Sequence, residues 1–300
     1  MDNKFNFSSK FRVANIFSLI LFVTSVLFIL FKGLNYGIDF KGGTLIELRA
    51  SSTGASEIRT ALNKMDLGDV NVKNFGQEGD YLIKVEQKEN DRNKIIPQIK
   101  ENLSENLKTE INFRRVENVG PKVSSELLQS GIIAISLSLA AMLFYIWIRF
   151  EWQFSIGSIV ALFHDVVITL GIFSALSLEI NLSIIAAVLT IVGYSMNDTV
   201  VIYDRIRENL NKYTKLNINE IADLSINDTL ARTIITSVTT LLALLSIFIL
   251  GGEILKGFSF AMILGVVIGT YSSIFVASPM LKFFKVTYKT LEKEEEKIVP

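Results

Sequence analysis

The 300-residue sequence contains no cysteine, one histidine and four prolines. Without cysteine, the chain cannot form disulfides, iron-sulfur clusters, cysteine-ligated zinc sites or a thiol nucleophile. Its 30 basic and 30 acidic residues give a formal net charge of zero. No basic stripe with interleaved aromatics is present either, so we predict no nucleic-acid binding. Low-complexity tracts are also missing, which leaves little room for disorder outside the two termini.

The common signatures of enzyme active sites are absent as well. No GxxxxGK[ST] phosphate loop, HExxH motif or carboxylate cluster occurs, so we expect no nucleotide hydrolysis, bound metal or cofactor. The segment 193–197 (GYSMN) lacks the last glycine of the GxSxG nucleophile elbow and lies in a hydrophobic run rather than at a strand-to-helix turn. We therefore predict that the chain is not an enzyme.

Hydrophobic residues are abundant: they make up 50% of the chain and occur in long blocks. A helix needs about 20 apolar residues to cross the hydrocarbon core of a bilayer. Six stretches approach or exceed this length, so we predict an α-helical bundle of six transmembrane helices. The first follows Lys4, Lys10 and Arg12 but has no small-residue cleavage site after it, and we interpret it as an uncleaved anchor. The predicted spans are 13–31, 131–148, 155–177, 182–202, 234–250 and 257–283.

Basic residues predict the orientation of these spans. Those in the short connections and tails gather on one side, whereas the short loops of the other side contain only Lys256. The positive-inside rule therefore places both termini in the cytoplasm. Trp147 and Trp152 fit an aromatic belt at the same interface. We expect four parts: 1–31 with the first span, 32–122 as an extracytoplasmic domain, 123–284 with five spans, and 285–300 as a cytoplasmic tail.

The extracytoplasmic insert shows a β-α-β-β-α-β pattern. Alternating apolar residues predict strands, and apolar residues at helical spacing predict helices. This order is that of the ferredoxin-like α+β plan. A fold of this kind does not by itself indicate a function. In chain order, the predicted elements are 44–48, 55–65, 70–75, 81–85, 91–107 and 111–116.

Ionisable residues inside the spans are the main functional candidates. They are His164 and Asp165 in the third span, Asp198 in the fourth and Arg232 at the start of the fifth. A charge at the bilayer centre costs about 2.5–3.5 kcal/mol on insertion scales, so such residues generally pair or line an ion path. Depth along the helices predicts that Asp198 and Arg232 can meet. The alternative is a structural ion pair at the cytoplasmic interface.

Three further patterns have competing interpretations. Asn197 shares a face of the fourth span with Asp198, and such a polar stripe favours a contact surface. Gly265 and Gly269 are four apart, a spacing that permits close helix packing, and packing within this chain is its simplest explanation. Asp39 precedes the pair Gly42-Gly43, which we interpret as a bend entering the first strand rather than a phosphate loop.

Four segments carry a resemblance to a known family: 36–44 (YGIDFKGGT), 194–209 (YSMNDTVVIYDRIREN), 232–240 (RTIITSVTT) and 269–279 (GTYSSIFVASP). In these segments and in their order the chain resembles the SecD/SecF family of protein-export membrane proteins, within the resistance-nodulation-division superfamily. The resemblance covers nearly the whole chain up to Lys289.

The resemblance implies a role in the Sec pathway of the bacterial cytoplasmic (inner) membrane. It implies a heterodimer with SecD beside the SecYEG translocon, YajC as a further associate, and a translocating preprotein as substrate. The energy source it implies is the proton or sodium motive force, with H⁺ or Na⁺ passing through the membrane-embedded protein. Asp198 and Arg232 match the ion-path residues of the family, and His164 and Asp165 match its His-Asp pair.

Two other functions remain open from the residues alone. The chain could be a non-transducing scaffold that stabilises SecYEG and SecD, in which case losing Asp198 leaves ion dependence unchanged. It could instead be a homodimeric exporter of the resistance-nodulation-division type, although the modest insert argues against an efflux pump. Purification from native membranes tests the homodimeric exporter. A different chain with six spans, present in equal amount, would contradict a homodimer.

Overall fold

The structure is a computed structural model that describes residues 5–50, 53–65, 67, 70–74, 79–85, 95–107, 111–288 and 290. It divides into two compact units. The first, which we call the bundle, contains residues up to Asn35, Ala134–Leu178 and everything from Ser183 onward. The second, which we call the inserted unit, contains Tyr36–Ile133 together with the short segment Glu179–Leu182.

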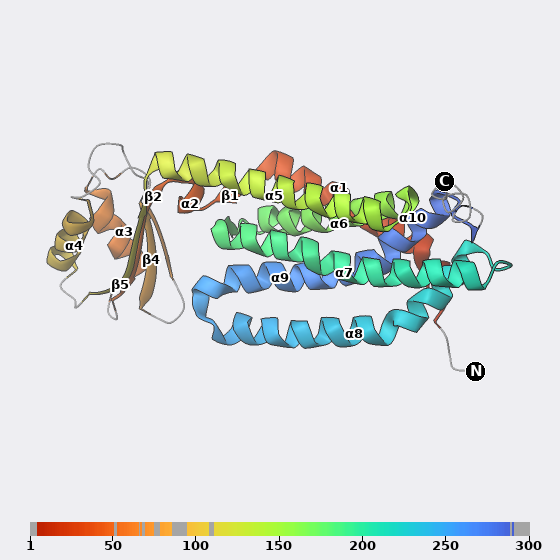
Figure 1. Cartoon of the computed structure of the whole chain (residues 1–300). Coiled ribbons are helices and arrows are strands. Elements are labelled where there is room, and N and C mark those ends of the chain that lie inside the picture. The colour runs from red at the N-terminus through yellow and green to blue at the C-terminus, as the bar shows by residue number, and fades with distance from the viewer. Residues whose placement is uncertain are drawn as a thin grey trace. The chain divides into compact units, whose positions relative to one another are not determined.

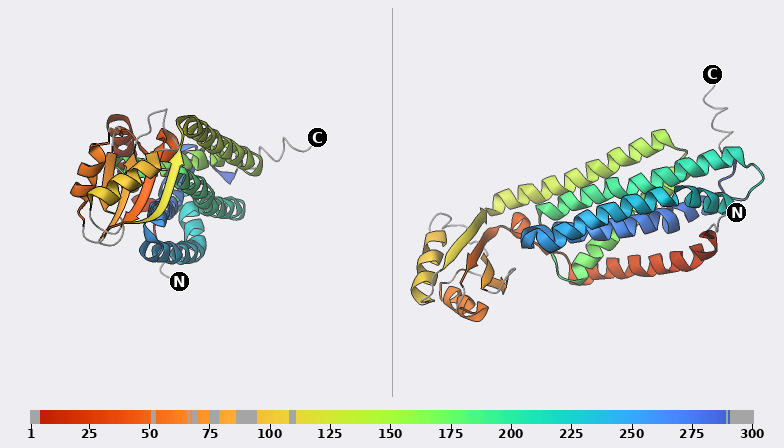
Figure 2. Two further views of the ribbon diagram at one scale, coloured as in Figure 1. Left: turned by 90° about the vertical axis from the view of Figure 1, so that its left-hand side faces the viewer. Right: turned by 90° about the horizontal axis from the view of Figure 1, so that it is seen from below.

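Among the described residues, six helices are long and apolar enough to cross a membrane, which confirms the predicted number of spans. In all three views the long helices of the bundle run side by side (Figures 1 and 2). The helices extend beyond most of the predicted limits because the backbone keeps its helical conformation into the polar flanks. After a short 3₁₀ turn, η1 (Ser8–Lys10), they are α1 (Phe11–Lys32), α5 (Pro121–Arg149), α6 (Trp152–Ala175), α7 (Leu182–Lys212), α8 (Ile218–Leu250) and α9 (Gly252–Ser272).

Polar flanks lengthen α7 and α8 in particular. With 31 and 33 residues they exceed the roughly 20 needed to span the hydrocarbon core. Asn217 caps α8: its side chain accepts hydrogen bonds from the main-chain nitrogens of Asn219 and Glu220, and the Glu220 side chain accepts from the nitrogen of Asn217. This capping box satisfies amide groups that the first helical turn leaves free.

The last span is interrupted by a π-helical turn. Helix α9 continues into η2 (Ser273–Ala277) and then α10 (Ser278–Phe283). Ser278 donates a side-chain hydrogen bond to the main-chain oxygen of Ser273, five residues earlier. Turns of this kind widen the helix locally and occur often at functional sites. Here the turn follows directly on the hydroxyl-rich segment Tyr271–Ser273.

Glycines bring the helices of the bundle close together. A Cβ atom on Gly269 would lie 2.9 Å from Cβ of Ser195, and one on Gly265 would overlap Ile191. Real Cβ atoms do not approach so closely, so α9 can lie against α7 at this depth only because both positions are glycine. The spacing of Gly265 and Gly269 therefore serves packing within this chain, as its simplest explanation predicts.

The inserted unit contains a four-stranded antiparallel sheet in the order β3-β4-β2-β5. The buried side chains of one sheet face and of two helices share a core that includes Ile46, Leu48, Ile58 and Ile83. All six predicted elements of this unit are confirmed, apart from predicted residues outside the described ones, such as Phe75 and 91–94. In chain order they are β2 (Gly43–Arg49), α3 (Ala55–Asn63), β3 (Val70–Asn74), β4 (Asp80–Val85), α4 (Ile95–Asn106) and β5 (Asn112–Val119).

A second, two-stranded sheet pairs β1 (Asn35–Tyr36) with β6 (Glu179–Ile180). Between β1 and β2 lies α2 (Ile38–Lys41), a single helical turn. Gly42 (φ 78°) and Gly43 (φ 134°) follow it in backbone conformations that favour glycine, and a Cβ on Gly43 would lie 2.7 Å from the oxygen of Val85. The glycine pair is the bend into the first strand of the large sheet, as the sequence predicts.

Candidate functional site

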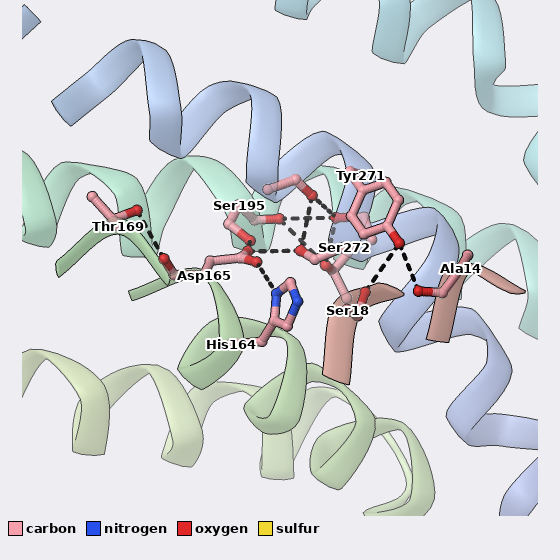
Figure 3. Close-up of polar contacts among 11 residues, drawn as sticks. Ala14, Ser18, His164, Asp165, Thr169, Ser195, Tyr271 and Ser272 are labelled. Atoms are coloured by element: carbon pink, nitrogen blue, oxygen red, sulfur yellow. Dashed lines mark hydrogen bonds and ion pairs between the residues drawn. The ribbon is translucent and has the colours of Figure 1, made fainter. Parts of the chain in front are cut away.

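Asp165 of α6 lies at the centre of a buried polar cluster (Figure 3). Its side chain is fully buried. Ser195 of α7 donates a hydrogen bond of 2.6 Å to Oδ2, and Ser272 of α9 donates one of 2.7 Å to the same oxygen. Nδ1 of His164 lies 2.9 Å from Oδ1. One carboxylate therefore holds three helices together, with both of its oxygens satisfied.

Close helix packing delivers these hydroxyls to Asp165. Ser195 contacts Gly269, the position at which α7 and α9 pack closely. Ser272 follows Gly269 by three residues on α9. Ser273 extends the network: its hydroxyl lies 2.8 Å from that of Thr199 and also donates to the main-chain oxygen of Gly269. Within a bilayer such bonds replace the water that would otherwise solvate a carboxylate.

His164 faces α1 and is also buried, with 5% of its surface exposed. Its ring stacks on Phe22 with the two planes 7° apart and the centroids separated by 6.5 Å. Nε2 is buried and has no hydrogen-bond partner among the described residues. One ring nitrogen is therefore held by Asp165, and the other is buried without a bond of this kind. His164 and Asp165 are brought together, as adjacent residues on one helix allow.

Asp198 of α7 is the second buried carboxylate, 3% exposed, and its surroundings are much poorer in donors. Thr270 of α9 donates one long hydrogen bond of 3.4 Å to Oδ2. The hydroxyl of Thr270 in turn lies 2.8 Å from that of Ser237 in α8. A short row of hydroxyls thus leads from Asp198 across α9 to α8.

The structure does not make the expected contact between Asp198 and Arg232. Neither residue has an ion-pair partner within 4.0 Å in the described part of the chain. Arg232 is exposed because the buried positions of α8 nearest to it are Thr233 and Ser237, and Arg232 lies about 100° around the helix from Thr233. Its charge acts on Asp198 through space only.

The predicted polar stripe of α7 is divided between two faces. Asp198 points into the bundle, whereas Asn197 is exposed. Exposed with Asn197 are Gly193, Thr190 and Ala186, which follow one another at helical spacing. Small or polar residues on an exposed face of a membrane helix differ from the large apolar residues expected against lipid. This face of α7, which we call the small-residue face, is a candidate contact surface.

Asp39, Gly42 and Gly43 belong to the inserted unit rather than to the buried cluster. Oδ2 of Asp39 accepts a hydrogen bond of 2.9 Å from the main-chain nitrogen of Leu182, the first residue of α7. No pattern in the sequence predicts this contact, because 143 positions separate the two residues.

The sequence did not predict the hydroxyl partners of the two carboxylates, Ser195, Ser272 and Thr270, or the contact of Thr270 with Ser237. Serine and threonine are common in membrane helices and usually bond to their own backbone. A signal was present in the run TYSS at 270–273, since four hydroxyls in four residues are unusual in a span. Their targets depend on helix packing, which that run does not specify.

The two carboxylates are suited to different chemistry. Two hydroxyl donors and the ring of His164 surround Asp165, so both of its oxygens have polar partners. Asp198 has one weak donor in a buried site, where an uncompensated charge is costly. Uptake of a proton or cation would relieve that cost. No group of three or more potential His, Cys, Asp or Glu metal ligands occurs among the described residues.

Family models match most of the chain. Residues 99–287 match the model described as "Protein export membrane protein SecD/SecF, C-terminal", and residues 27–53 match the "SecD/SecF GG Motif". The second match includes Asp39, Gly42 and Gly43. Among curated relatives, "Protein translocase subunit SecF" of Rickettsia rickettsii is 46% identical over 294 residues, covering 96% of both chains. The protein of the same description from Rickettsia bellii is 47% identical over 282 residues, covering 93% of both.

Solved structures give a consistent result. The chain is similar to SecDF of Thermus thermophilus, described as a translocon-associated membrane protein, with a TM-score of 0.85 and 36% identity over 95% of this chain. It is also similar to SecDF in the "super-membrane-facing form", with a TM-score of 0.71 and 35% identity. The chain spans only 39% and 40% of the length of those two SecDF chains.

Proposed function

The chain belongs to the SecD/SecF family of protein-export membrane proteins, and we propose that it acts as the SecF subunit of an accessory complex of the Sec translocase. In this proposal it works with SecD to couple the proton or sodium motive force to preprotein movement across the bacterial inner membrane. The observation that carries the proposal is Asp198, a buried carboxylate with a single long hydrogen bond inside a membrane helix.

Asp198 is the ion-binding residue in this mechanism. Holding its charge inside the membrane costs about 2.5–3.5 kcal/mol, and moving one charge through 100 mV supplies about 2.3 kcal/mol. Because the two quantities are similar, one proton or sodium ion per cycle can change the state of Asp198. Arg232 modulates the site through its field, and the hydroxyls of Thr270 and Ser237 offer a short path between α7 and α8.

Asp165 and His164 have a different role in the proposal. The fully hydrogen-bonded carboxylate of Asp165 fixes α6, α7 and α9 relative to one another. His164 holds the other carboxylate oxygen, with its Nδ1 2.9 Å from Oδ1. A change at Asp198 then displaces α7 relative to α8, together with the helices α6 and α9 that Asp165 ties to it.

SecD is the partner that we assign to the small-residue face of α7. Ala186, Thr190, Gly193 and Asn197 allow a second helix to approach closely and offer it an amide to bond. In the similar SecDF structures this chain matches only 39% and 40% of one polypeptide, so the rest of those polypeptides indicates what a SecD partner would look like. SecYEG, YajC and the preprotein are further partners implied by the family.

Orientation completes the proposal. Both termini lie in the cytoplasm, and the inserted unit lies outside it, where it can meet the emerging preprotein. We assign this unit to the ferredoxin-like plan, which the chain order β2-α3-β3-β4-α4-β5 and the strand order β3-β4-β2-β5 support. The short loops and tails of the cytoplasmic side carry most of the basic residues outside the inserted unit, in agreement with the positive-inside rule.

Precursor accumulation tests the proposed function. Cells depleted of the native protein receive wild type, Asp198→Asn or the control Asp204→Asn at matched membrane levels. Asp204 lies in the same helix but is half-exposed and pairs with Arg149 at 2.7 Å, so its loss should matter little. Precursors should accumulate with Asp198→Asn as with an empty vector, while the variant still co-purifies with SecD. Normal export by Asp198→Asn would contradict ion coupling and favour the scaffold function.

A further inference from the structure

The first residue of α7 is held by the inserted unit. Oδ2 of Asp39 accepts a hydrogen bond of 2.9 Å from the main-chain nitrogen of Leu182. The first amide groups of a helix have no partner within the helix, and the helix dipole places positive charge at this end. A carboxylate is therefore the side chain best suited to hold it.

The residues just before Leu182 are fixed by the same part of the chain. The main-chain nitrogen of Gly37 donates a 2.8 Å hydrogen bond to the oxygen of Ile180. Gly37 also lies against the side chain of Glu179, where a Cβ would come within 2.6 Å of Oε1. Lys84 of β4 forms an ion pair with Glu179. Together with Asp39, these contacts form what we call the clasp on residues 179–182.

The boundary between the inserted unit and the bundle agrees with the contacts of the clasp. Glu179–Leu182 group with the inserted unit, whereas Ser183 and the rest of α7 group with the bundle. The boundary therefore falls inside the first turn of one continuous helix of 31 residues. Asp198 lies 16 residues beyond Leu182 on that helix, about 24 Å along a rigid rod at 1.5 Å per residue. Asp39 therefore binds the first residue of the same helix that carries Asp198.

We propose that Asp39 is a positioning residue that passes a displacement of α7 to the inserted unit. This inference rests on the proposed function, in which an ion at Asp198 displaces α7. When the Asp39–Leu182 bond is intact, movement of α7 pulls on α2 and, through the Gly42-Gly43 bend, on strand β2. When the bond is absent, only the contacts of Gly37 and Lys84 with residues 179–180 remain, and less of the displacement of α7 reaches the inserted unit. Ion movement and export then become uncoupled.

Two substitutions remove the same hydrogen bond from opposite sides. Asp39→Ala removes the acceptor. Leu182→Pro removes the donor, and proline is tolerated at the first position of a helix because its missing N–H is not needed there. Leu182→Ala keeps the N–H and is the matched control. The double variant Asp39→Ala/Leu182→Pro completes a cycle that isolates the bond from other effects of each change.

The experiment measures two quantities in vesicles that contain the whole complex: ion movement through it and ion-driven export. We expect Asp39→Ala and Leu182→Pro each to reduce export at least tenfold while ion movement stays within twofold of wild type, with the double variant no worse than either single one. Export that stays normal, or that falls in proportion to ion movement, would overturn the inference. So would additive losses in the double variant, which indicate two separate structural defects.

Asp198→Asn distinguishes this inference from the proposed function on which it rests. Under the proposed function it abolishes both ion movement and ion-driven export. If Asp198→Asn leaves both unchanged, the proposed function has failed. If Asp198→Asn abolishes both and the clasp variants behave as wild type, the proposed function stands and the role of Asp39 is refuted.

Discussion

Thr270 of α9 donates a 3.4 Å hydrogen bond to Oδ2 of Asp198 in α7, and this is the only hydrogen bond found for that side chain among the described residues. By contrast, Asp165 has three polar neighbours within 2.9 Å. The proposed ion-responsive role of Asp198 and the proposed structural role of Asp165 rest on this difference, and each can be tested separately.

Removing the hydroxyl of Thr270 should change the pH dependence of export. Thr270→Val keeps nearly the same shape but leaves the ionised form of Asp198 without its donor, so the protonated form is favoured. We expect the pH of half-maximal ion-driven export in vesicles to move upward. Thr169→Val is the control, since Thr169 donates to the main-chain oxygen of Asp165 and not to a carboxylate. An unchanged pH profile for Thr270→Val would contradict the role given to this bond.

Asp165→Asn should destabilise the bundle more than Asp198→Asn does. The amide group of asparagine would present N–H donors where Ser195 and Ser272 now donate, and each unsatisfied buried group costs about 1–3 kcal/mol. Asp198→Asn loses one weak bond and removes a buried charge, so its stability should equal or exceed that of wild type. Thermal unfolding of the purified proteins in one detergent measures both. Equal midpoints for the two variants would show that Asp165 is not a structural centre.

Gly269→Ala should destabilise the protein through overpacking. Its Cβ would meet Ser195 at 2.9 Å, and forcing α9 away from α7 costs about 1–3 kcal/mol. Gly193→Ala is the matched control, because a Cβ there has no atom within 4 Å and alanine is favoured over glycine in helices. The unfolding midpoint should fall for the first variant and hold or rise for the second. The reverse order would refute the close approach of these helices.

The small-residue face of α7 should be needed for pairing with SecD. Gly193→Leu fills the closest point of approach, and we expect at least a tenfold loss of co-purified SecD from solubilised membranes, because close helix packing depends on small side chains. Ala243→Leu makes a comparable change on an exposed position of α8 and serves as the control. Undiminished SecD with Gly193→Leu would place the interface on another face.

Hydrophobic length and alternation predict most of the fold. Each of the six spans is recognisable because the bilayer demands a long apolar helix, and the strands of the inserted unit are recognisable because their side chains alternate. The π-helical turn at Ser273–Ala277 was not predicted, since we found no local composition signal for it.

The candidate site was only partly predictable. Asp165, His164 and Asp198 stand out because charge is rare inside a span. Their partners Ser195, Ser272 and Thr270 depend on which helix faces which, and one sequence does not specify that. The predicted meeting of Asp198 with Arg232 was wrong for the same reason: it was based on depth along two helices, and depth does not determine the rotation of α8 about its axis.

The dependence of export on membrane energy, measured in vesicles with wild type and with Asp198→Asn, tests the central claim most directly. Preprotein movement is followed after the ATP-driven stage while the ion gradient is set to several values. Ion coupling through Asp198 predicts that export rises with the gradient for wild type and for Asp204→Asn, but is flat for Asp198→Asn. An equal rise for Asp198→Asn would contradict the claim.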